Sequence, residues 1–518
     1  MNPRREHLLR SVRLPTWVQN AVFYQIFVDR FGRGESCNLP LHYETVNLEP
    51  WDAQPTRTGY KGGDLRGIIE KLSYLGDLGI TALCLTPIFA ASSNHRYTVQ
   101  DFFRIDPLLG DEGVFRDLLA AAHHNGIRVI LDGVFNHVGR GFYQFADVVE
   151  NGAASPWANW FRVQGWPISP YNKSRPANYA CWYGHRELPE LNHANPDVRE
   201  HLMQVAERWT EFGIDGWRLD AADCISATGF WEEFRSRVRA INPEAYLVAE
   251  VVHKAERLLD GSRFDAVTNY PFYTATLRFV GGSRLRREYL RSWKSTSRIS
   301  AEMYGARARH LFGLYPMEVC LAQMNFLENH DTARLMTMLG DDRDLFIIAH
   351  LLMFASPGVP CLYYGSEIGL SGGRDPLCRG SFRAESHWDR ELLLAVRNIV
   401  RLRRASSALR VGDYTVLMAR GDTLVFSRQC KSEAVVVALN VGSTPVRVGA
   451  NISDSIARQL GDGASVVFGS GCVRHSEKSL ILEIPSKSGL VYGLSSLSDS
   501  ITHNTATRIG SHPSERLR

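Results

Sequence analysis

Short hydrophobic runs of strand length alternate, along most of the chain, with segments that have the spacing of amphipathic helices. The first run, residues 21–29, ends in polar residues. After Asp64 the hydrophobic residues recur every three or four positions, at Leu65, Ile68, Ile69, Leu72, Leu75 and Leu78. Gly79 follows this series and predicts the end of the helix. The chain therefore begins with a strand followed by a helix, and this order recurs.

The hydrophobic runs end near residues 29, 86, 132, 220, 250, 270, 328 and 364, with gaps of helix length or longer between them. Eight alternating β/α units are typical of an α/β protein with a (β/α)8 TIM barrel. A doubly wound open sheet and two separate α/β domains are alternatives that explain the count less well. We predict a barrel formed by residues 21–137 and 196–408, preceded by an N-terminal tail at 1–20.

Two segments depart from the alternation. Residues 138–195 are rich in Trp, Pro, Gly and Asn and are too long for a structureless loop, so we expect a small excursion domain after the third strand. Residues 409–494 contain short alternating strands with Gly turns, which predict a C-terminal antiparallel β-sandwich. The polar residues 495–518 are expected to be a disordered tail.

The charge balance excludes several classes of partner. Fifty-nine basic and fifty-five acidic residues leave a net charge of +4 without a basic stripe, so neither nucleic acid nor an anionic membrane is indicated. We find neither a signal peptide pattern nor a hydrophobic run long enough to cross a membrane. The nine cysteines lack CxxC spacing, which favours reduced thiols in a cytoplasmic protein and argues against a zinc site.

Polar clusters stand at four of the predicted strand ends. They are Asp132 to His137, Arg218 to Asp220, Glu250, and Glu328 to Asp331. The carboxyl ends of barrel strands meet at one face, which is where barrel enzymes place their sites. In a strand, alternate residues point to the same side, so Arg218 can adjoin Asp220 and hold this carboxylate ionised. A buried Arg/Asp pair that only organises the barrel rim is the alternative.

Two carboxyls on opposite sides of a sugar's anomeric centre suit glycoside hydrolysis. Asp220, beside Arg218, suits the nucleophile. Glu250 ends a hydrophobic run and faces other carboxylates, so we expect its pKa to be raised, as a proton donor requires. Taken singly, the aspartates could cap helices and the histidines could lie in the core. Together, at four strand ends, they favour a catalytic site.

These clusters, in this order, resemble the defining motifs of the α-amylase superfamily of retaining glycoside hydrolases. Further matching motifs lie at residues 24–25, 29–31, 62–65, 95–97 with Asp101, and 358–365. Residues 188–192 and 268–272 are similar to the branch of neopullulanases, cyclomaltodextrinases and maltogenic amylases. The resemblance covers roughly residues 20 to 490.

The resemblance implies hydrolysis of α-1,4 and also α-1,6 glucosidic bonds in maltodextrins and other α-glucans. It makes Asp220 the nucleophile, Glu250 the acid/base and Asp331 the carboxylate that stabilises the transition state. The substrate-binding residues it implies, which line the subsite of the glucose being cleaved, are Tyr97, Asp132, His137, Arg218 and His330. For a retaining enzyme the two catalytic carboxyls should lie about 5–5.5 Å apart.

The chain also departs from the family. Only about twenty residues precede the first strand, whereas the branch commonly carries an N-terminal β-domain, so the resemblance predicts neither the oligomeric state nor a cyclodextrin preference. Valines follow Glu250 where the branch usually has an aromatic residue, which should weaken or reshape the leaving-group subsite.

Calcium is a separate question. The α-amylases that bind calcium use an asparagine at the position of Asn136 and a histidine four residues after the nucleophile, and here that second position is Cys224. A thiol is a poor ligand for this hard cation. We therefore expect no metal and no other cofactor, with the family's calcium site absent or altered.

Three alternatives stay open. A transglycosylase uses the same chemistry with a sugar as the acceptor, and the exclusion of water decides between the two outcomes. A non-catalytic relative that binds glycans or partner proteins would lack the carboxylates and carry a membrane span. An unrelated TIM-barrel enzyme with a phosphate site would need a Gly-rich loop after the seventh or eighth strand.

Overall fold

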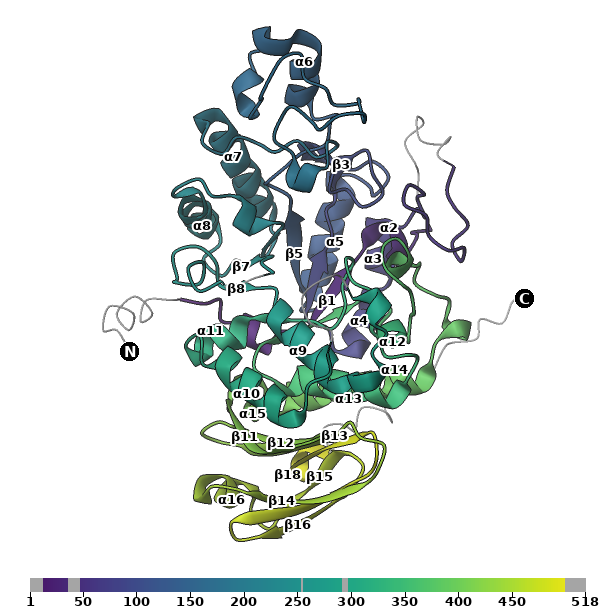
Figure 1. The fold of residues 1–518 in the computed structure, drawn as a ribbon, viewed down its shortest axis with the longest axis vertical. Helices are drawn as coiled ribbons and strands as arrows, with labels where there is room; N and C mark the ends of the chain where they lie inside the picture. The colour runs from purple at the N-terminus through teal and green to yellow at the C-terminus, as the bar shows by residue number, and fades with distance from the viewer. Residues whose placement is uncertain (1–12, 36–46, 253–254, 291–296, 499–518) are drawn as a thin grey trace, which may run out of the picture.

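The structure of the protein, a computed structural model, describes residues 13–35, 47–252, 255–290 and 297–498. The barrel occupies the middle of an elongated molecule (Figure 1). The segment around α6 lies at one end, and the C-terminal strands lie at the other. Of the predicted tails, residues 1–12 and 499–518 lie outside the described residues.

Eight parallel strands form the barrel, and the predicted TIM-barrel fold is confirmed. Their order around the sheet is β8-β7-β6-β5-β2-β1-β10-β9. A parallel bridge between Thr268 and Met324 brings the two outer strands together and nearly closes the barrel. The strands are β1 (Phe23–Ile26), β2 (Ala82–Leu85), β5 (Arg128–Gly133), β6 (Gly216–Leu219), β7 (Tyr246–Ala249), β8 (Ala266–Val267), β9 (Met324–Asn325) and β10 (Val359–Tyr363).

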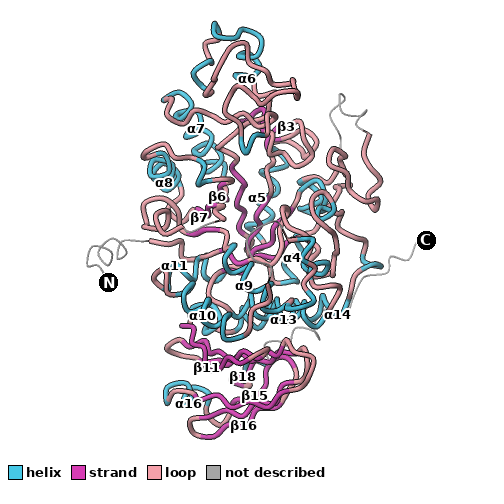
Figure 2. Tube along the Cα trace, in the orientation of Figure 1, coloured by secondary structure: helices cyan, strands magenta, loops and turns pink. Residues whose placement is uncertain are grey.

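Helices surround the strands (Figure 2). They are α2 (Val28–Phe31), α3 (Leu65–Glu70), α4 (Leu72–Leu78), α5 (Glu112–His124), α7 (Pro196–Phe212), α8 (Phe230–Ile241), α9 (Tyr270–Val280), α10 (Ala301–Phe312), α11 (Met317–Ala322), α12 (Leu335–Met338), α13 (Arg343–Ala355), α14 (Arg390–Ala405) and α15 (Ser407–Val411).

The single helix predicted between Asp64 and Gly79 is wrong, because the structure has two helices that meet at Lys71. Lys71 leaves helical geometry at φ −99° and ψ 3°, and its N–H donates to the carbonyls of Ile68 and Ile69. The predicted ends are right: Asp64 caps α3, and Gly79 ends α4 in the left-handed conformation at φ 94°.

Residues 138–195 leave the barrel between β5 and α7 and consist mostly of loops (Figure 2). They contain α6 (Tyr143–Asn151) and three short 3-10 helices, η2 (Gly152–Ala154), η3 (Ala158–Trp160) and η4 (Trp182–Gly184). An antiparallel bridge between His137 and Glu190 ties the returning chain to the end of β5. A separate two-stranded sheet, β3 (Phe89–Ala91) and β4 (Val99–Ile105), follows β2.

The C-terminal strands form two antiparallel sheets. The first has the order β11-β12-β13-β18-β15 and the second β14-β17-β16. A separate group of buried hydrophobic side chains lies in this part of the chain. The elements are β11 (Asp413–Arg420), β12 (Thr423–Gln429), β13 (Ala434–Asn440), β14 (Val446–Asn451), α16 (Asp454–Leu460), β15 (Ala464–Gly469), β16 (Cys472–Ser476), β17 (Ser479–Ile484) and β18 (Ser488–Leu494).

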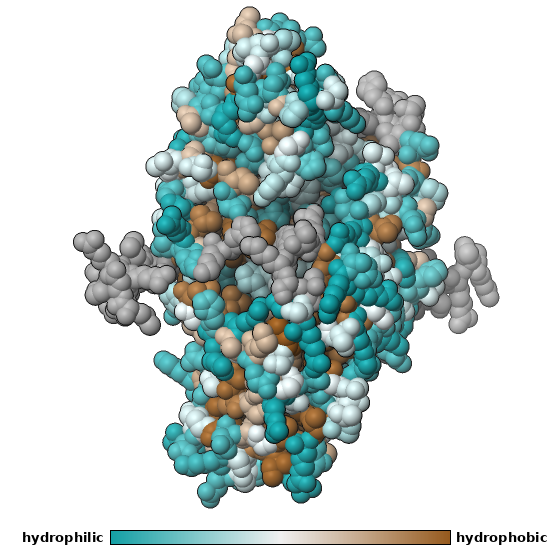
Figure 3. Space-filling view, viewed as in Figure 1, coloured by the Kyte–Doolittle hydropathy of each residue, from teal (hydrophilic) through white to brown (hydrophobic). Residues whose placement is uncertain are grey.

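The surface in Figure 3 is mostly hydrophilic, with hydrophobic side chains in small groups. No helix of the described ranges is long and apolar enough to cross a membrane.

Candidate active site

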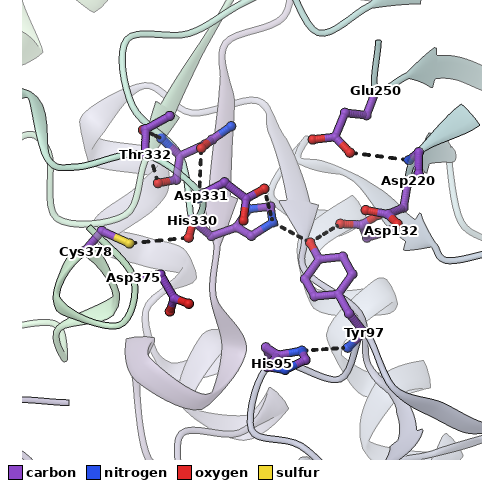
Figure 4. Close-up of polar contacts among 12 residues, drawn as sticks. His95, Tyr97, Asp132, Asp220, Glu250, His330, Asp331, Thr332, Asp375 and Cys378 are labelled. Carbon is purple, nitrogen blue, oxygen red and sulfur yellow. Dashed lines mark hydrogen bonds and ion pairs between the residues drawn. The ribbon is translucent and has the colours of Figure 1, made fainter. Parts of the chain in front are cut away.

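The sheet register brings the predicted site residues to one level of the barrel. Asp132 of β5 pairs with Arg218 of β6. Asp220 directly follows β6, and Glu250 directly follows β7, whose Ala249 pairs with Leu219. The loop after β9 supplies His330 and Asp331, which face the other carboxylates in Figure 4. Residues from four strand ends therefore meet in one cluster at this end of the barrel.

Arg218 lies at the centre of this charge cluster and is 2% exposed. One nitrogen, Nη1, donates to both oxygens of Asp132 at 2.7 and 2.9 Å and to Oδ1 of Asp220 at 2.9 Å. The other, Nη2, lies 2.7 Å from Oε1 of Glu250. One guanidinium thus holds three carboxyls, and the predicted contact between Arg218 and Asp220 is present.

The expectation that Arg218 simply holds Asp220 ionised needs correction. Burial raises the pKa of Asp220, and the neighbouring carboxylates of Asp132 and Asp331 raise it further, whereas Arg218 lowers it. The net effect is upward because removal from water disfavours the charged form more than one shared guanidinium favours it. The pKa of Asp220 is therefore raised rather than lowered.

Glu250 has the environment expected of a proton donor. Burial raises its pKa to about 7, in spite of Arg218, and the charges of Asp220 and Asp331 add to the rise. The Tyr270 hydroxyl donates to its Oε1 at 3.0 Å, and the Ala221 N–H donates to its Oε2 at 3.3 Å. These bonds fix the carboxyl of Glu250, which lies beside Asp220 in Figure 4. A carboxyl with a pKa near 7 can carry a proton and release it during the reaction.

Tyr97 links Asp132 to His330. Its hydroxyl donates to Oδ2 of Asp132 at 2.7 Å and lies 2.6 Å from Nε2 of His330. A tyrosine has one hydroxyl hydrogen, so the second contact requires that His330 donates from Nε2. The two rings stack with centroids 5.3 Å apart and an interplanar angle of 12°. This arrangement fixes the Tyr97 ring beside Asp132 and His330, where the resemblance places the glucose.

Asp331 is held by a residue that the sequence did not reveal. Nη2 of Arg379 lies 3.4 Å from Oδ1 of Asp331, and Nε donates to the His330 carbonyl at 2.9 Å. Arg379 itself is almost buried and pairs with Asp375 at 2.9 Å. It lies in η8 (Leu377–Arg379), within an irregular loop after β10. Tyr270, too, was only part of a matching motif, with no expected contact to Glu250.

His137 follows β5 and contacts the excursion at residues 138–195. Its ring lies 5.4 Å from that of Trp182, centroid to centroid. Burial lowers the pKa of His137 to about 3, so the ring is neutral at pH 7. A neutral imidazole can donate one hydrogen bond and accept another. Trp182 was not singled out by the sequence pattern, because its segment has no regular periodicity.

The residues at the family's calcium position do not fit that ion. Asn136 is buried, with its Nδ2 3.4 Å from Nδ1 of His137. Cys224 presents a thiol whose pKa burial raises to about 11, so the sulfur is neutral at pH 7. Calcium prefers oxygen ligands. Within the described ranges, no three His, Cys, Asp or Glu side chains are grouped as a metal site.

The chain is similar to known proteins over most of its length. Residues 25–395 match the family model of the α-amylase catalytic domain. A cyclomaltodextrinase from Geobacillus thermopakistaniensis is 40% identical over 443 residues, which are 84% of this chain and 71% of that protein. Neopullulanase 2 from Thermoactinomyces vulgaris is 38% identical over 431 residues, 82% of this chain and 70% of that protein.

Solved structures agree as well. The native debranching enzyme of Nostoc punctiforme is 44% identical, with a TM-score of 0.86 over 93% of this chain and 100% of that chain. The cyclic α-maltosyl-(1→6)-maltose hydrolase of Arthrobacter globiformis is 33% identical, with a TM-score of 0.80 over 93% of this chain and 100% of that chain. The chain thus belongs to the α-amylase family of glycoside hydrolases, in the branch of cyclomaltodextrinases, neopullulanases and maltogenic amylases.

Proposed function

We propose that the protein hydrolyses α-1,4 and α-1,6 glucosidic bonds in short α-glucans by a retaining double displacement. The observation that carries this proposal is the sharing of one buried guanidinium by Asp220 and Glu250, at 2.9 and 2.7 Å. This sharing supports two carboxyls close enough for a nucleophile and an acid/base to act on one anomeric carbon. A separation of about 5–5.5 Å remains the prediction.

In the first step, a carboxylate oxygen of Asp220 attacks the anomeric carbon as the bond to the leaving sugar breaks. Glu250 gives its proton to the glycosidic oxygen, so the leaving sugar departs as a neutral alcohol. The product of this step is a β-glucosyl ester on Asp220. Positive charge that develops on the ring during the attack is stabilised by the carboxylate of Asp331.

In the second step, Glu250, now ionised, takes a proton from water. The water oxygen attacks the anomeric carbon and the ester bond to Asp220 breaks, which restores both carboxyls and the α-configuration. Arg218 contacts both residues, so its positive charge stabilises Asp220 when Asp220 is ionised and Glu250 when Glu250 is ionised.

The substrate class rests on the relatives. Their names specify cyclomaltodextrinases, neopullulanase and maltogenic amylases, and a solved neighbour is a debranching enzyme. These names share one class of substrate, maltodextrins with α-1,4 and α-1,6 bonds. A cytoplasmic location is part of the proposal, supported by a relative named as an intracellular maltogenic amylase and by the free cysteines of the described chain.

The test is a product profile from maltoheptaose, pullulan and β-cyclodextrin with the wild type and Asp220→Asn. We expect short maltooligosaccharides from the wild type and a loss of activity of at least about 10⁴-fold in the variant, because the nucleophile is absent. Asp197→Asn, at an exposed carboxylate in the first turn of α7, serves as the matched control.

Proton NMR of the first-formed product tests the stereochemistry. Release of the α-anomer supports the double displacement, and release of the β-anomer contradicts it. Products longer than the substrate would identify a transglycosylase, and an inactive wild type would refute the proposed substrate class.

A further inference from the structure

The tyrosine that donates to Glu250 is itself held by a buried asparagine. Nδ2 of Asn329 donates to the Tyr270 oxygen at 3.3 Å, and the Tyr270 hydroxyl donates to Oε1 of Glu250 at 3.0 Å. Glu250 follows β7, Tyr270 begins α9, and Asn329 lies in the loop after β9. Asn329 is 7% exposed. A chain of hydrogen bonds therefore joins three separate elements of the barrel behind the charged residues.

The other end of the Asn329 amide holds the backbone of Asp331. Its Oδ1 accepts from the Asp331 N–H at 2.9 Å, in the turn that an asparagine side chain forms with the backbone two residues on. The Asn329 N–H donates to Oγ1 of Thr332 at 2.9 Å and closes the same turn. One amide thus lies between the acid/base and the residue expected to stabilise the transition state.

The direction of each hydrogen bond follows from these partners. A backbone N–H only donates, so the atom of Asn329 that faces Asp331 is the oxygen, and the NH2 group faces Tyr270. The NH2 group also only donates, so the phenol oxygen accepts from it and the single phenol hydrogen is left for Glu250. Burial raises the pKa of Tyr270 well above its usual value, so the phenol keeps this hydrogen at neutral pH.

The two oxygens of Glu250 consequently have different surroundings. Oε1 faces two close donors, the Tyr270 hydroxyl at 3.0 Å and Nη2 of Arg218 at 2.7 Å. Oε2 accepts from the Ala221 N–H at the longer distance of 3.3 Å. A proton on Oε1 would oppose both of its donors, so the acid proton belongs on Oε2.

We infer that Asn329 is a positioning residue, which aims the Tyr270 hydroxyl at Oε1 of Glu250 and so leaves Oε2 to carry the proton for the glycosidic oxygen. The inference rests on the proposed function. Hydrogen bonds in a chain polarise one another, so the bond from Asn329 also strengthens the bond that the phenol donates to Glu250. This donation favours ionised Glu250, the form that takes a proton from water in the second step.

The experiment measures the pH profile of kcat/KM on maltotetraose for Asn329→Ser, Asn329→Ala, Tyr270→Phe and the double variant of Asn329→Ser with Tyr270→Phe. A serine hydroxyl can accept from the N–H two residues on but is too short to reach Tyr270. Asn329→Ser therefore removes one bond of the amide and Asn329→Ala removes both. Thr332→Val is the matched control, because it loosens the same turn and keeps the Asn329 side chain.

The alkaline limb of this profile reports the proton of Glu250. For Asn329→Ser we expect the limb to move up by about 0.5 pH unit, because the phenol stays but loses the group that directs it. In the Tyr270→Phe background the serine should add less than about 0.2 pH unit, because the phenol through which Asn329 acts is gone. Thr332→Val should leave the limb in place.

The other groups that act on Glu250 stay the same in the Asn329 and Thr332 variants, so a moved limb reports the hydrogen-bond chain. The charged and titratable groups that face Glu250 are Asp132, Tyr183, Arg218, Asp220, Tyr270 and Asp331.

A second substrate, α-maltosyl fluoride, separates the two ends of the amide. Fluoride departs with little help from an acid, so kcat/KM for this substrate reports Asp331 more than Glu250. We expect Asn329→Ser to stay within about twofold of the wild type and Asn329→Ala to fall about three- to tenfold, because only the alanine releases the Asp331 backbone.

Three outcomes overturn the inference while the proposed function stands. In the first, the limb of Asn329→Ser coincides with that of the wild type. In the second, the serine moves the limb equally with and without the Tyr270 hydroxyl, so Asn329 acts by another route. In the third, Thr332→Val moves the limb as far as Asn329→Ser does. A wild type that does not cleave maltotetraose refutes the proposed function, and the inference falls with it.

Discussion

Replacement of Arg218 by methionine gives the sharpest test of how the site is held together. The side chain is buried, and it is the guanidinium that Asp132, Asp220 and Glu250 share. Methionine fills a similar volume but removes the charge and the donors. Removal of one partner from a buried ionic group lowers the free energy of unfolding by about 3–5 kcal/mol. We expect Arg218→Met to lower it by this amount at pH 8.

The loss of stability in Arg218→Met should be smaller at pH 5. Burial already raises the pKa of Glu250 to about 7 with Arg218 in place, and loss of Arg218 raises it further. A carboxyl whose pKa is higher in the folded than in the unfolded state, about 4.3 for Glu, binds its proton more tightly when folded. Its contribution to stability is present below the unfolded-state pKa and is lost as the pH rises through the folded-state pKa. At pH 5 the carboxyls of the variant therefore take protons, and the cost falls to about 1–2 kcal/mol.

Calorimetry at pH 5 and pH 8 measures this difference. For a chain of 518 residues, about 1 kcal/mol shifts Tm by about 1 °C, so Arg218→Met should lower Tm by about 3–5 °C at pH 8 and 1–2 °C at pH 5. Arg428→Met is the control. Arg428 is equally buried but donates only to the carbonyls of Gly412 and Ala355, so its loss should cost the same at both pH values. An equal or larger loss for Arg218→Met at pH 5 would refute the reasoning.

Three further predictions follow from the contacts of the site. Tyr270→Phe removes a hydrogen-bond donor that favours the ionised form of Glu250, so the pKa of Glu250 should rise. The alkaline limb of the pH profile of kcat/KM, expected near pH 7 in the wild type, should therefore move up by about 1 pH unit. A limb that does not move contradicts the assignment of Glu250 as the acid. Arg379→Met should lower kcat about tenfold or more with KM within about twofold, because it displaces Asp331; Arg374→Met, at an exposed arginine of the same loop, should change neither. Dialysis against EDTA should leave Tm and activity unchanged, because a thiol stands where a calcium ligand is needed, and a lower Tm after dialysis would show that calcium is bound.

The barrel could be predicted from the sequence because each of its strands is a hydrophobic run that ends in polar residues. Asp132, Arg218 and Glu250 stand at such ends, so counting the runs also located the polar clusters. Hydrophobic spacing did not predict the break at Lys71, because the hydrophobic face continues through it. Only the backbone there departs from the helix, and side-chain periodicity does not report backbone dihedral angles.

Arg379 and Trp182 could not be predicted from periodicity for a different reason. Both lie in irregular segments, where position is set by long-range contacts rather than by local repeats. Arg379 reaches the site because a loop after β10 folds back toward the loop after β9. Trp182 does so because its segment returns to the end of β5. Contacts that join distant parts of the chain are visible only in the structure.

Burial, together with the charge balance of the site, explains why Asp132, Asp220 and Glu250 have raised pKa values. Asp132, Asp220, Glu250 and Asp331 can carry four negative charges, whereas Arg218 supplies one positive charge and Arg379 supplies another that it shares with Asp375. Burial makes the excess of negative charge costly, so the cluster retains protons near pH 7. Because Arg218 touches both Asp220 and Glu250, a proton held by this pair leaves one carboxyl ionised for attack and the other able to donate. The shortage of positive charge that raises the pKa values thus also provides the ionised carboxyl and the protonated carboxyl that the first step requires.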